Sequence, residues 1–490
     1  MKYILAVDIG TTSAKALVVS EKGEVLASAQ EFYPTQHPQA DFAEQDAEVI
    51  FQAVKKIIRQ SADKVSGKID ALSFSSAMHS LMAVDKKGEA LTPLIIWADL
   101  RSKNEAHEIL SRGGQKIYEE TGTPIHSMSP LCKLLWIKKN QPDILASAFK
   151  FIGIKEYIWG KFFGNFVVDH SVASATGLFD IRHKVWSEKA IKVAGIKKEQ
   201  LSSTCSALTI FKNPSDQLAT ELGLQTSVQW VIGASDGCLA NLGSGAMDEK
   251  TLSLTIGTSG AVRKAARINS PDSKGRTFHY LLDDDTLITG GATNNGAILV
   301  QWFAEKMLKE KVNVKTFGER ASGIAPGAEG LIFLPYVLGE RAPVFDPDSS
   351  GVFLGIRQRH TQEHFMRAML EGVGYALLSI AEVVEENSGP FDKVIASGGF
   401  IKSAHWVQII ADIFGKEFTV RGTEDASALG AALIGFQALK VETDFKFPNA
   451  RTFRPDLNVY QKYQKYFSVY KNLYPHLAAD FHLLNQIANG

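Results

Sequence analysis

A strand that ends in a glycine-threonine turn and leads into a second strand occurs twice in this chain, once in each half. The first copy, AVDIGTTSAKALVV, covers residues 6–19, and the second, LTIGTSGAV, covers residues 254–262. Apolar, β-branched runs closed by glycine are typical of buried strands. The repeat therefore predicts two related α/β halves. Only the first copy carries a carboxylate, Asp8, where the second has Thr255.

The segments around the first turn predict a mixed α/β layer. Strands are expected over 3–10, 14–20 and 25–33, with a hairpin turn at 21–24, and a further strand over 69–76. Asp46 is expected to cap an intervening helix. The apolar residues of that helix recur with helical spacing and should form one face, made of Val49, Ile50, Ala53, Val54, Ile57 and Ile58.

The same order returns in the second half. It predicts strand, turn and strand over 251–265, a hairpin over 278–291, and a helix that contains Ile298, Val300, Trp302 and Phe303. A long helix over about 362–387, a strand over 393–399 and a helix over 404–414 follow. The joint is expected near 243–250, which gives domains 1–246 and 247–490.

The composition argues against several classes of partner. Lys plus Arg and Asp plus Glu both number 53 in 490 residues, so no overall charge favours nucleic acid or an anionic membrane. The three cysteines are far apart and support neither disulfides nor a zinc site. No apolar stretch approaches the roughly 20 residues of a membrane-spanning helix. The expectation is a cytoplasmic protein without nucleic-acid or membrane partners.

The C-terminal segment carries an aromatic stripe with spacings of 3, 4, 3 and 4, which suits one face of a helix. Its members are Tyr460, Tyr463, Phe467, Tyr470 and Tyr474. The stripe fits either a subunit interface, as in a homodimer, or a terminal helix packed on its own core. The second interpretation is preferred.

The two turns suit phosphate binding, because glycine admits a phosphate close to the backbone and the hydroxyls donate hydrogen bonds. Asp8 can hold Mg²⁺, so the repeat is interpreted as two phosphate clamps of which one bears a metal. Asp236 follows an apolar strand among small residues; it could accept a hydroxyl proton or merely cap the next helix. Gly398 and Gly399 suit a nucleotide or a plain tight turn.

Other motifs are excluded. A P-loop is absent, and GSGAMD at 243–248 lacks the third glycine of a dinucleotide fingerprint. HTQEH at 360–364 has Thr361 at the second position, where a zinc protease has glutamate. DPDSSG at 346–351 starts like a calcium loop but has Arg357 at the twelfth position.

The combination of segments resembles the FGGY family of carbohydrate kinases, within the actin-like and hexokinase-like ATPase superfamily. MSPLCKLLWIKKN at 128–140 is similar to the first signature of the family, and GVFLGIRQRHTQEHFMRAMLE at 351–371 is similar to the second. The segments FSSAMHS, IIWADLRS, TGTPIHSMSP, DHSVASATG and GERAP look most like those of gluconate kinases. Pentulose kinases share the Met-His pair and the W-x-D-x-R pattern.

The resemblance implies two ribonuclease-H-like domains around a cleft, with the sugar on the N-terminal side and ATP on the C-terminal side. It implies that Asp236 is the general base and that the substrate contacts Met78, His79, Asp99, Arg101 and Asp236. The nucleotide would lie against Thr11, Thr12, Ser13, Thr258, Gly296, Gln301, Gly398, Gly399 and Ser403. Mg²⁺ would lie near Asp8 and Asp236.

The function expected from this resemblance is ATP-dependent phosphorylation of a sugar acid, D-gluconate. A pentulose kinase such as xylulokinase is the nearest alternative. An actin-like ATPase without sugar kinase activity and a catalytically inactive sugar sensor belong to different classes. A gluconate carboxylate needs a donor or a positive charge, for which His79, Arg101, His126 and Lys155 are the candidates.

Overall fold

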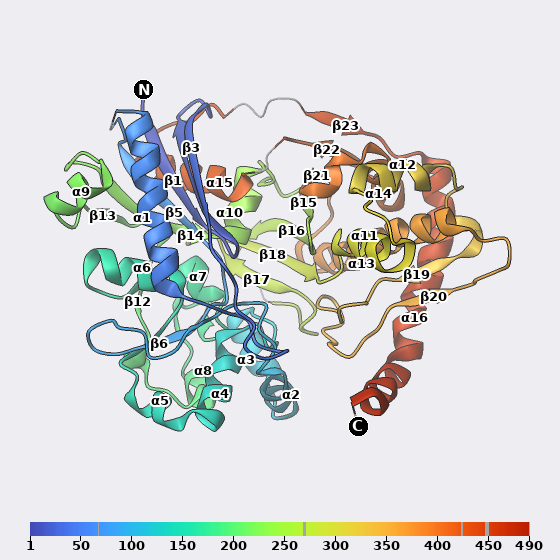
Figure 1. The fold of residues 1–490 in the computed structure, drawn as a ribbon, viewed down its shortest axis with the longest axis horizontal. Coiled ribbons are helices and arrows are strands. Elements are labelled where there is room, and N and C mark those ends of the chain that lie inside the picture. Colours follow the sequence, from blue (N-terminus) through green and yellow to red (C-terminus); the bar gives the residue numbers. More distant parts are fainter. Residues whose placement is uncertain (67, 268–270, 423–424, 446–449, 490) are drawn as a thin grey trace. The chain divides into compact units, whose positions relative to one another are not determined.

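The protein divides into two compact units that interleave along the chain (Figure 1). The computed structural model describes residues 1–66, 68–267, 271–422, 425–445 and 450–489. Unit 1 comprises Met1–Gly245, Ala266–Ile288 and Asp425–Lys446, and unit 2 comprises Ala246–Ala265, Thr289–Glu424 and Phe447–Gly490. The boundary expected between residues 246 and 247 lies next to the first change of unit, after Gly245. A single boundary does not describe the two units, because two later segments of the chain pack with unit 1.

A six-stranded sheet organises unit 1, in the order β13-β14-β5-β1-β2-β3. Its strands are β1 (Tyr3–Ile9), β2 (Ser13–Ser20), β3 (Val25–Phe32), β5 (Ala71–Ser76), β13 (Ile210–Lys212) and β14 (Gln229–Ser235). The strand β1 is antiparallel to β2 and parallel to β5, and β14 is parallel to β5. The predicted order of three antiparallel strands, a helix and a further strand is confirmed.

Two helices cover opposite faces of this sheet. On one face, α1 (Ala47–Lys64) packs its apolar stripe onto Leu5 and Val7. Asp46 caps it as predicted, by accepting hydrogen bonds from the amides of Glu48 and Val49. The expected apolar face is otherwise correct, but Val49 is exposed and does not belong to it.

The helix α15 (Ala426–Ala438) covers the other face, since Gly435 lies against Ile4. It also packs closely on α10 (Asp236–Gly243): a Cβ at Gly430 would lie 2.0 Å from the carbonyl oxygen of Leu239. Glycine is required there because no side chain fits between the two backbones. The helix that begins at Asp236 is thereby packed tightly against α15 within unit 1.

The other elements of unit 1 lie outside this six-stranded sheet. They are β4 (Glu44–Gln45), β6 (Met82–Val84), β7 (Leu94–Ile95), α2 (Lys103–Ser111), α3 (Gln115–Thr121), α4 (Pro130–Asn140), α5 (Pro142–Ser147), β8 (Lys150–Ile152), α6 (Ile154–Phe163), β9 (Val167–Asp169), α7 (His170–Ser174), β10 (Phe179–Asp180), β11 (Val185–Trp186), α8 (Glu188–Ala194), η1 (Lys198–Gln200), β12 (Ser203–Cys205), α9 (Asp216–Leu222) and β17 (Phe278–Leu281).

Unit 2 repeats the strand arrangement of unit 1. Here β15 (Thr251–Ile256) is antiparallel to β16 (Gly260–Arg267) and parallel to β21 (Lys393–Ser397), with β22 (Glu417–Val420) and β23 (Arg451–Phe453) beyond. Asp8 is paired in register with Ser75, and Thr255 is paired in the same way with Ser397. The sequence repeat is therefore a structural repeat, and Thr255 occupies the place of Asp8.

The remaining elements of the second half complete its core and connections. They are β18 (Thr286–Thr293), which runs from unit 1 into unit 2 and neighbours β17, then α11 (Ile298–Trp302), the π-helical turn η2 (Phe303–Leu308), α12 (Val314–Ser322), η3 (Ala328–Gly330), β19 (Ile332–Leu334), β20 (Val352–Leu354), α13 (Gln362–Ser388), η4 (Gly399–Lys402), α14 (Ala404–Phe414) and α16 (Leu457–Asn489). The predicted hairpin and the helices α13 and α14 are confirmed.

The aromatic stripe of the C-terminal helix packs within unit 2. Tyr463, Phe467 and Tyr470 are buried in its hydrophobic core. The Tyr463 hydroxyl also contacts the buried ion pair of Arg367 and Glu371 on α13. The preferred interpretation, a terminal helix on its own core, is confirmed.

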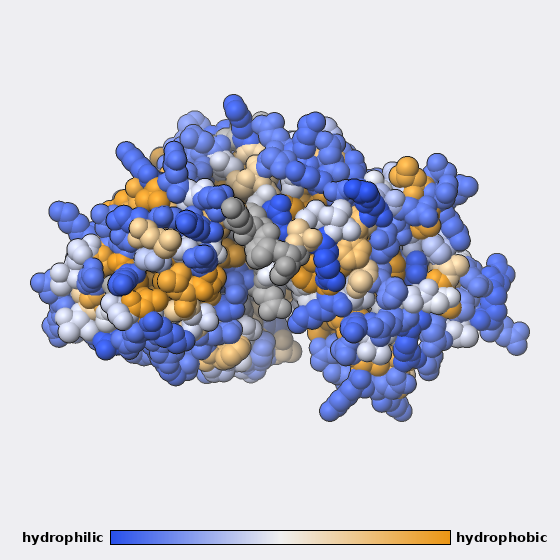
Figure 2. Space-filling view, turned by 90° about the horizontal axis from the view of Figure 1, so that it is seen from above, coloured by the Kyte–Doolittle hydropathy of each residue, from blue (hydrophilic) through white to orange (hydrophobic). Residues whose placement is uncertain are grey.

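Hydrophilic residues occupy most of the face shown in Figure 2, with hydrophobic patches between them. In the part of the chain that the structure describes, no helix combines the length and hydropathy needed to cross a membrane.

Candidate active site

Three parallel strands of unit 1 end at the same edge of the sheet. The neighbours β14, β5 and β1 lead respectively to Asp236, to Met78 and His79, and to the Gly10–Ser13 turn. Ligands of open α/β sheets bind outside the carboxyl ends of the strands. The predicted base, sugar residues and first phosphate turn therefore belong to one edge.

Asp8 is a partly exposed carboxylate near the end of β1. Its Oδ1 accepts a hydrogen bond of 2.6 Å from the Ser75 hydroxyl, and an ion pair between Lys15 and Asp425 lies close by. Burial raises the pKa of Asp8; the Ser75 bond opposes this rise, the Asp425 charge adds to it and the Lys15 charge opposes it. A carboxylate that is costly to ionise beside a second carboxylate is chemically suited to a hard cation, so these residues fit Mg²⁺.

The first phosphate turn keeps hydroxyl protons available for a ligand. Thr11 Oγ1 accepts a hydrogen bond of 2.8 Å from the Trp97 indole, and Ser13 Oγ accepts one of 2.9 Å from Gln30. A hydroxyl that accepts still has its own proton to donate. Thr12 is exposed. All three residues can therefore donate to phosphate oxygens.

Asp236 is the first residue of α10, and its Oδ1 accepts a hydrogen bond of 2.7 Å from the Gly237 amide. Two buried groups hold the strand that leads to it. The Ser171 Oγ lies 2.9 Å from the Ser235 Oγ and accepts a hydrogen bond of 3.1 Å from the Ser235 amide. Lys155 Nζ donates to the carbonyl of Ala234 at 3.2 Å. The carboxylate is thus a partly exposed group on a rigid support.

His79 is buried and has a left-handed backbone, with φ of 66°. Its Nδ1 lies 2.7 Å from the carbonyl oxygen of Ala175, which requires Nδ1 to carry a proton. In the neutral ring Nε2 is then an acceptor, and the Tyr280 hydroxyl lies 3.5 Å from it. Met78, the preceding residue, is partly exposed. The pair combines one apolar and one polar contact for a sugar.

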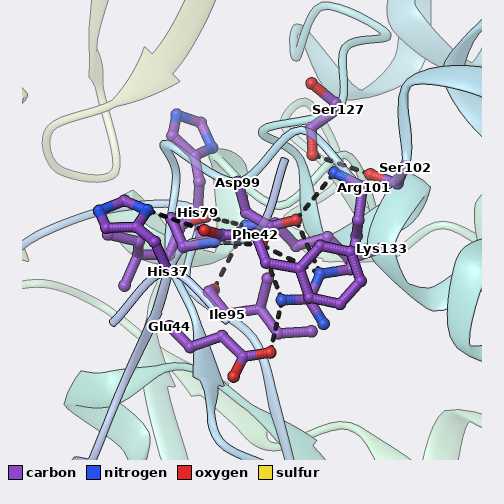
Figure 3. A network of polar contacts seen from close by, with 12 residues as sticks. His37, Phe42, Glu44, His79, Ile95, Asp99, Arg101, Ser102, Ser127 and Lys133 are labelled. Atoms are coloured by element: carbon purple, nitrogen blue, oxygen red, sulfur yellow. Dashed lines mark hydrogen bonds and ion pairs between the residues drawn. The ribbon is translucent and has the colours of Figure 1, made fainter. Parts of the chain in front are cut away.

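Asp99 and Arg101 form a buried network with protein partners (Figure 3). Arg101 Nε bonds both carboxylate oxygens of Asp99, at 2.9 and 3.0 Å, and Nη2 reaches Asp99 at 2.8 Å and Glu44 at 2.5 Å. The guanidinium also lies 3.7 Å from the ring centroid of Phe42. In these bonds Arg101 donates to carboxylates of the protein itself. Direct contact of the substrate with Asp99 and Arg101 therefore stays a prediction.

Lys155, another candidate for the substrate carboxylate, is also engaged by the protein. It is 1% exposed, and its Nζ lies 2.6 Å from Asp169, which is fully buried. His126 is partly exposed, and its Nδ1 accepts a hydrogen bond of 3.1 Å from the Met128 amide. The imidazole proton of His126 therefore lies on Nε2, which makes that atom a donor.

In unit 2 the predicted nucleotide residues fall into two groups. The Thr258 carbonyl accepts hydrogen bonds of 3.2 Å from the amides of Gly296 and Ile298, which brings the second turn and the start of α11 together. Gly398, with φ of 96°, and Gly399 follow β21 at the edge where β15 also ends. No heavy atom would lie within 4 Å of a Cβ at Gly399. The open space at Gly399 fits a nucleotide phosphate or base.

Two other predicted residues have local partners. Ser403 is buried and caps α14 by accepting a hydrogen bond of 3.3 Å from the Trp406 amide. Gln301 is exposed and bonds Glu305 on the same helical segment at 2.8 Å. Their contact with a nucleotide stays a prediction.

Sequence reasoning missed several residues that support the site: Lys133, Trp97, Ser75, Tyr280 and Asp425. Lys133 had a local signal, because it is the one charged residue in the apolar run PLCKLLW. Asp425 had none, since its partner Lys15 lies 410 residues away in the chain.

The paired strand–turn–strand halves define a mixed α/β two-domain fold of the actin-like and hexokinase-like ATPase superfamily, as found in sugar kinases. The models of the FGGY family of carbohydrate kinases match both halves, the N-terminal domain over residues 3–243 and the C-terminal domain over 252–439. The chain belongs to this family and is a carbohydrate kinase, a phosphotransferase that acts on a small molecule and ATP.

The relatives carry two substrate names. The chain is 41% identical over 451 residues to a gluconokinase of Bacillus subtilis, covering 89% of this chain and 87% of the relative. A crystal structure named gluconate kinase from Lactobacillus acidophilus matches with a TM-score of 0.94 and 33% identity, covering 99% of both chains. One named ligand-bound xylulose kinase from the same organism matches with the same TM-score and identity, covering 99% of this chain and 100% of that one.

Proposed function

We propose that the protein phosphorylates D-gluconate at its primary hydroxyl with ATP, giving 6-phospho-D-gluconate and ADP. The observation that carries the choice of substrate is the 41% identity to a Bacillus gluconokinase over most of both chains. Membership of the FGGY family favours a sugar kinase over an actin-like ATPase or an inactive sensor.

Asp236 acts as the general base. It takes the proton of the primary hydroxyl while the hydroxyl oxygen forms a bond to the γ-phosphorus of ATP. The bond from that phosphorus to the β,γ-bridging oxygen breaks, and ADP leaves with the bonding electrons. Asp236 lies in the first turn of α10, at the positive end of the helix dipole.

The two turns bind the phosphates. The hydroxyls of Thr11, Thr12 and Thr258 donate to phosphate oxygens, and the open turn at Gly398 and Gly399 receives the nucleotide. Asp8, together with Asp236, would hold Mg²⁺, whose charge offsets that of the triphosphate. Thr255, at the matching position of unit 2, has no carboxylate, which is consistent with a single metal anchor.

The substrate carboxylate needs a hydrogen-bond donor or a positive charge. Arg101 and Lys155 already serve buried protein acids. We assign His126, whose Nδ1 accepts from the Met128 amide so that Nε2 carries the ring proton, as a donor to the carboxylate, with His79 beside the polyol chain.

A coupled assay with gluconate, xylulose, ribulose and glycerol tests the substrate. We expect the highest kcat/KM with gluconate. A higher value with xylulose would replace gluconate by a ketose and leave the kinase assignment in place.

The variant Asp236→Asn tests the base. Its amide oxygen can still accept the hydrogen bond from Gly237, but the side chain cannot take a proton. We expect kcat to fall by about 10²- to 10⁴-fold with the binding of both substrates retained. Asp216→Asn is a matched control, because Asp216 is likewise the first residue of a helix after a serine cap and is exposed. Equal turnover in the two variants would refute the base.

A further inference from the structure

Lys133 on α4 is a buried cation with an unusual set of partners (Figure 3). Its side chain is fully buried, and its Nζ donates to three backbone carbonyls, those of His79 at 2.6 Å, Ile96 at 2.8 Å and Ile95 at 3.3 Å. An ammonium group has three protons. Each can therefore be directed at one carbonyl oxygen, and no carboxylate takes part in these bonds.

The three carbonyls belong to two separate segments, one of which follows β5 at the edge described above. His79 lies in the segment that follows β5, whereas Ile95 and Ile96 belong to β7 and the residue after it. The second segment continues to Trp97, whose indole bonds Thr11 in the phosphate turn. One ammonium group thus joins the two backbones that carry a sugar residue and a support of the phosphate turn.

The backbone at His79 needs such support. A φ of 66° is uncommon for a residue with a side chain. The Lys133 bond fixes the carbonyl of His79 and so the plane of the following peptide, while the Ala175 carbonyl fixes the ring. Together they determine where Nε2 of the imidazole points.

The arrangement is costly as a simple element of core packing. Burial lowers the pKa of Lys133 to about 7, with the Asp99 charge opposing this and the Arg101 charge adding to it. An apolar residue of similar length would avoid the desolvation of a charge. The bonds to the carbonyls are what such a residue could not supply.

We propose that Lys133 is a positioning residue for the sugar site, whose ammonium group ties the backbone at His79 to that at Ile95–Ile96 so that His79 faces the substrate correctly. The proposal rests on the sugar-binding role of His79 given above. Lys133 itself touches protein atoms, so it acts through the residues that it holds.

The test compares Lys133→Met with Lys264→Met. Lys264 is 1% exposed and donates to the carbonyls of Ser388, Gly389 and Pro390 at 2.7, 2.6 and 3.2 Å, at the end of α13 in unit 2. The two substitutions remove the same chemistry from different places. A purely structural role predicts the same kinetic outcome for both variants.

We expect Lys133→Met to raise KM for the sugar about tenfold or more and to raise KM for ATP by a smaller factor. Lys264→Met should leave both KM values near those of the wild type. A wild-type KM for the sugar in folded Lys133→Met, or an equal rise in both variants, would overturn the proposal.

Two further choices keep the result decisive. If Lys133→Met does not fold, Lys133→Arg is measured instead. Its planar guanidinium keeps the charge but cannot reproduce the three bonds to the carbonyls. A raised KM for the sugar then supports the proposal, and a wild-type KM overturns it.

The sugar used is whichever one the wild type phosphorylates best. A failure of the gluconate assignment is thus seen in the wild type alone, separately from the outcome for Lys133.

Discussion

Acidification should destabilise unit 1 through one buried histidine, His279 on β17. The side chain is fully buried, and its Nε2 accepts hydrogen bonds from the Asp272 amide at 3.2 Å and the Thr277 hydroxyl at 3.1 Å. An Nε2 that accepts from an amide must carry a lone pair, so the ring is neutral. Protonation would turn this acceptor into a donor that faces another donor.

Burial lowers the pKa of His279 from 6.5 to about 4, with the Asp272 charge partly opposing the change. The unfolded chain therefore binds a proton between these two pH values and the folded chain does not. By linkage, the contribution of His279 to stability is fully present above pH 6.5 and is lost as the pH falls towards 4. The full difference corresponds to about 3 kcal/mol, most of which is lost between pH 7 and pH 4.5.

Urea unfolding at pH 7 and pH 4.5, followed by tryptophan fluorescence, measures this loss. Five of the seven tryptophans lie in unit 1, all except Trp302 and Trp406. The variant His279→Gln has an amide oxygen that can replace Nε2 as acceptor, and it does not titrate. Its loss of stability on acidification should be smaller than that of the wild type by about 2 kcal/mol.

His107→Gln is the control, because His107 is exposed on α2, and this variant should follow the wild type. If His279→Gln loses as much stability between the two pH values as the wild type, the reasoning is refuted. Protonation of His279 should also affect the candidate active site, because the next residue, Tyr280, contacts His79.

Two further predictions concern the ligands. Replacing Asp8 with alanine should raise the Mg²⁺ concentration needed for half-maximal turnover and lower kcat, with sugar binding in the absence of nucleotide retained; a Mg²⁺ titration at fixed ATP that matches the wild type would remove Asp8 from the metal. His126→Leu, which has no donor, should lower kcat/KM for gluconate by a factor that corresponds to roughly 1.5–3 kcal/mol, the range for a charged hydrogen bond, and should lower kcat/KM for xylulose less. Equal losses for the two sugars would place the carboxylate elsewhere.

The sequence by itself determined the local elements and their repetition. The Gly-Thr turns, the strands on either side of them, the Asp46 cap and the bounds of α14 follow from hydrophobic spacing and capping, which act over a few residues. The correspondence of Asp8 with Thr255 was visible in the aligned sequences of the two turns. The matching register of β1 with β5 and of β15 with β21 confirms it.

Only the tertiary structure decided which charged side chains are paired with other groups of the protein. Arg101 reads as a free cation in the sequence, yet it is bound to Asp99 and to Glu44, which lies 57 residues away. Lys133 lies in an apolar helix, and its carbonyl partners come from two other segments. Likewise, residues 266–288 and 425–446 pack with unit 1 although they follow the sequence boundary. Such partners depend on which segments the packing brings together, and no spacing along a single segment encodes them.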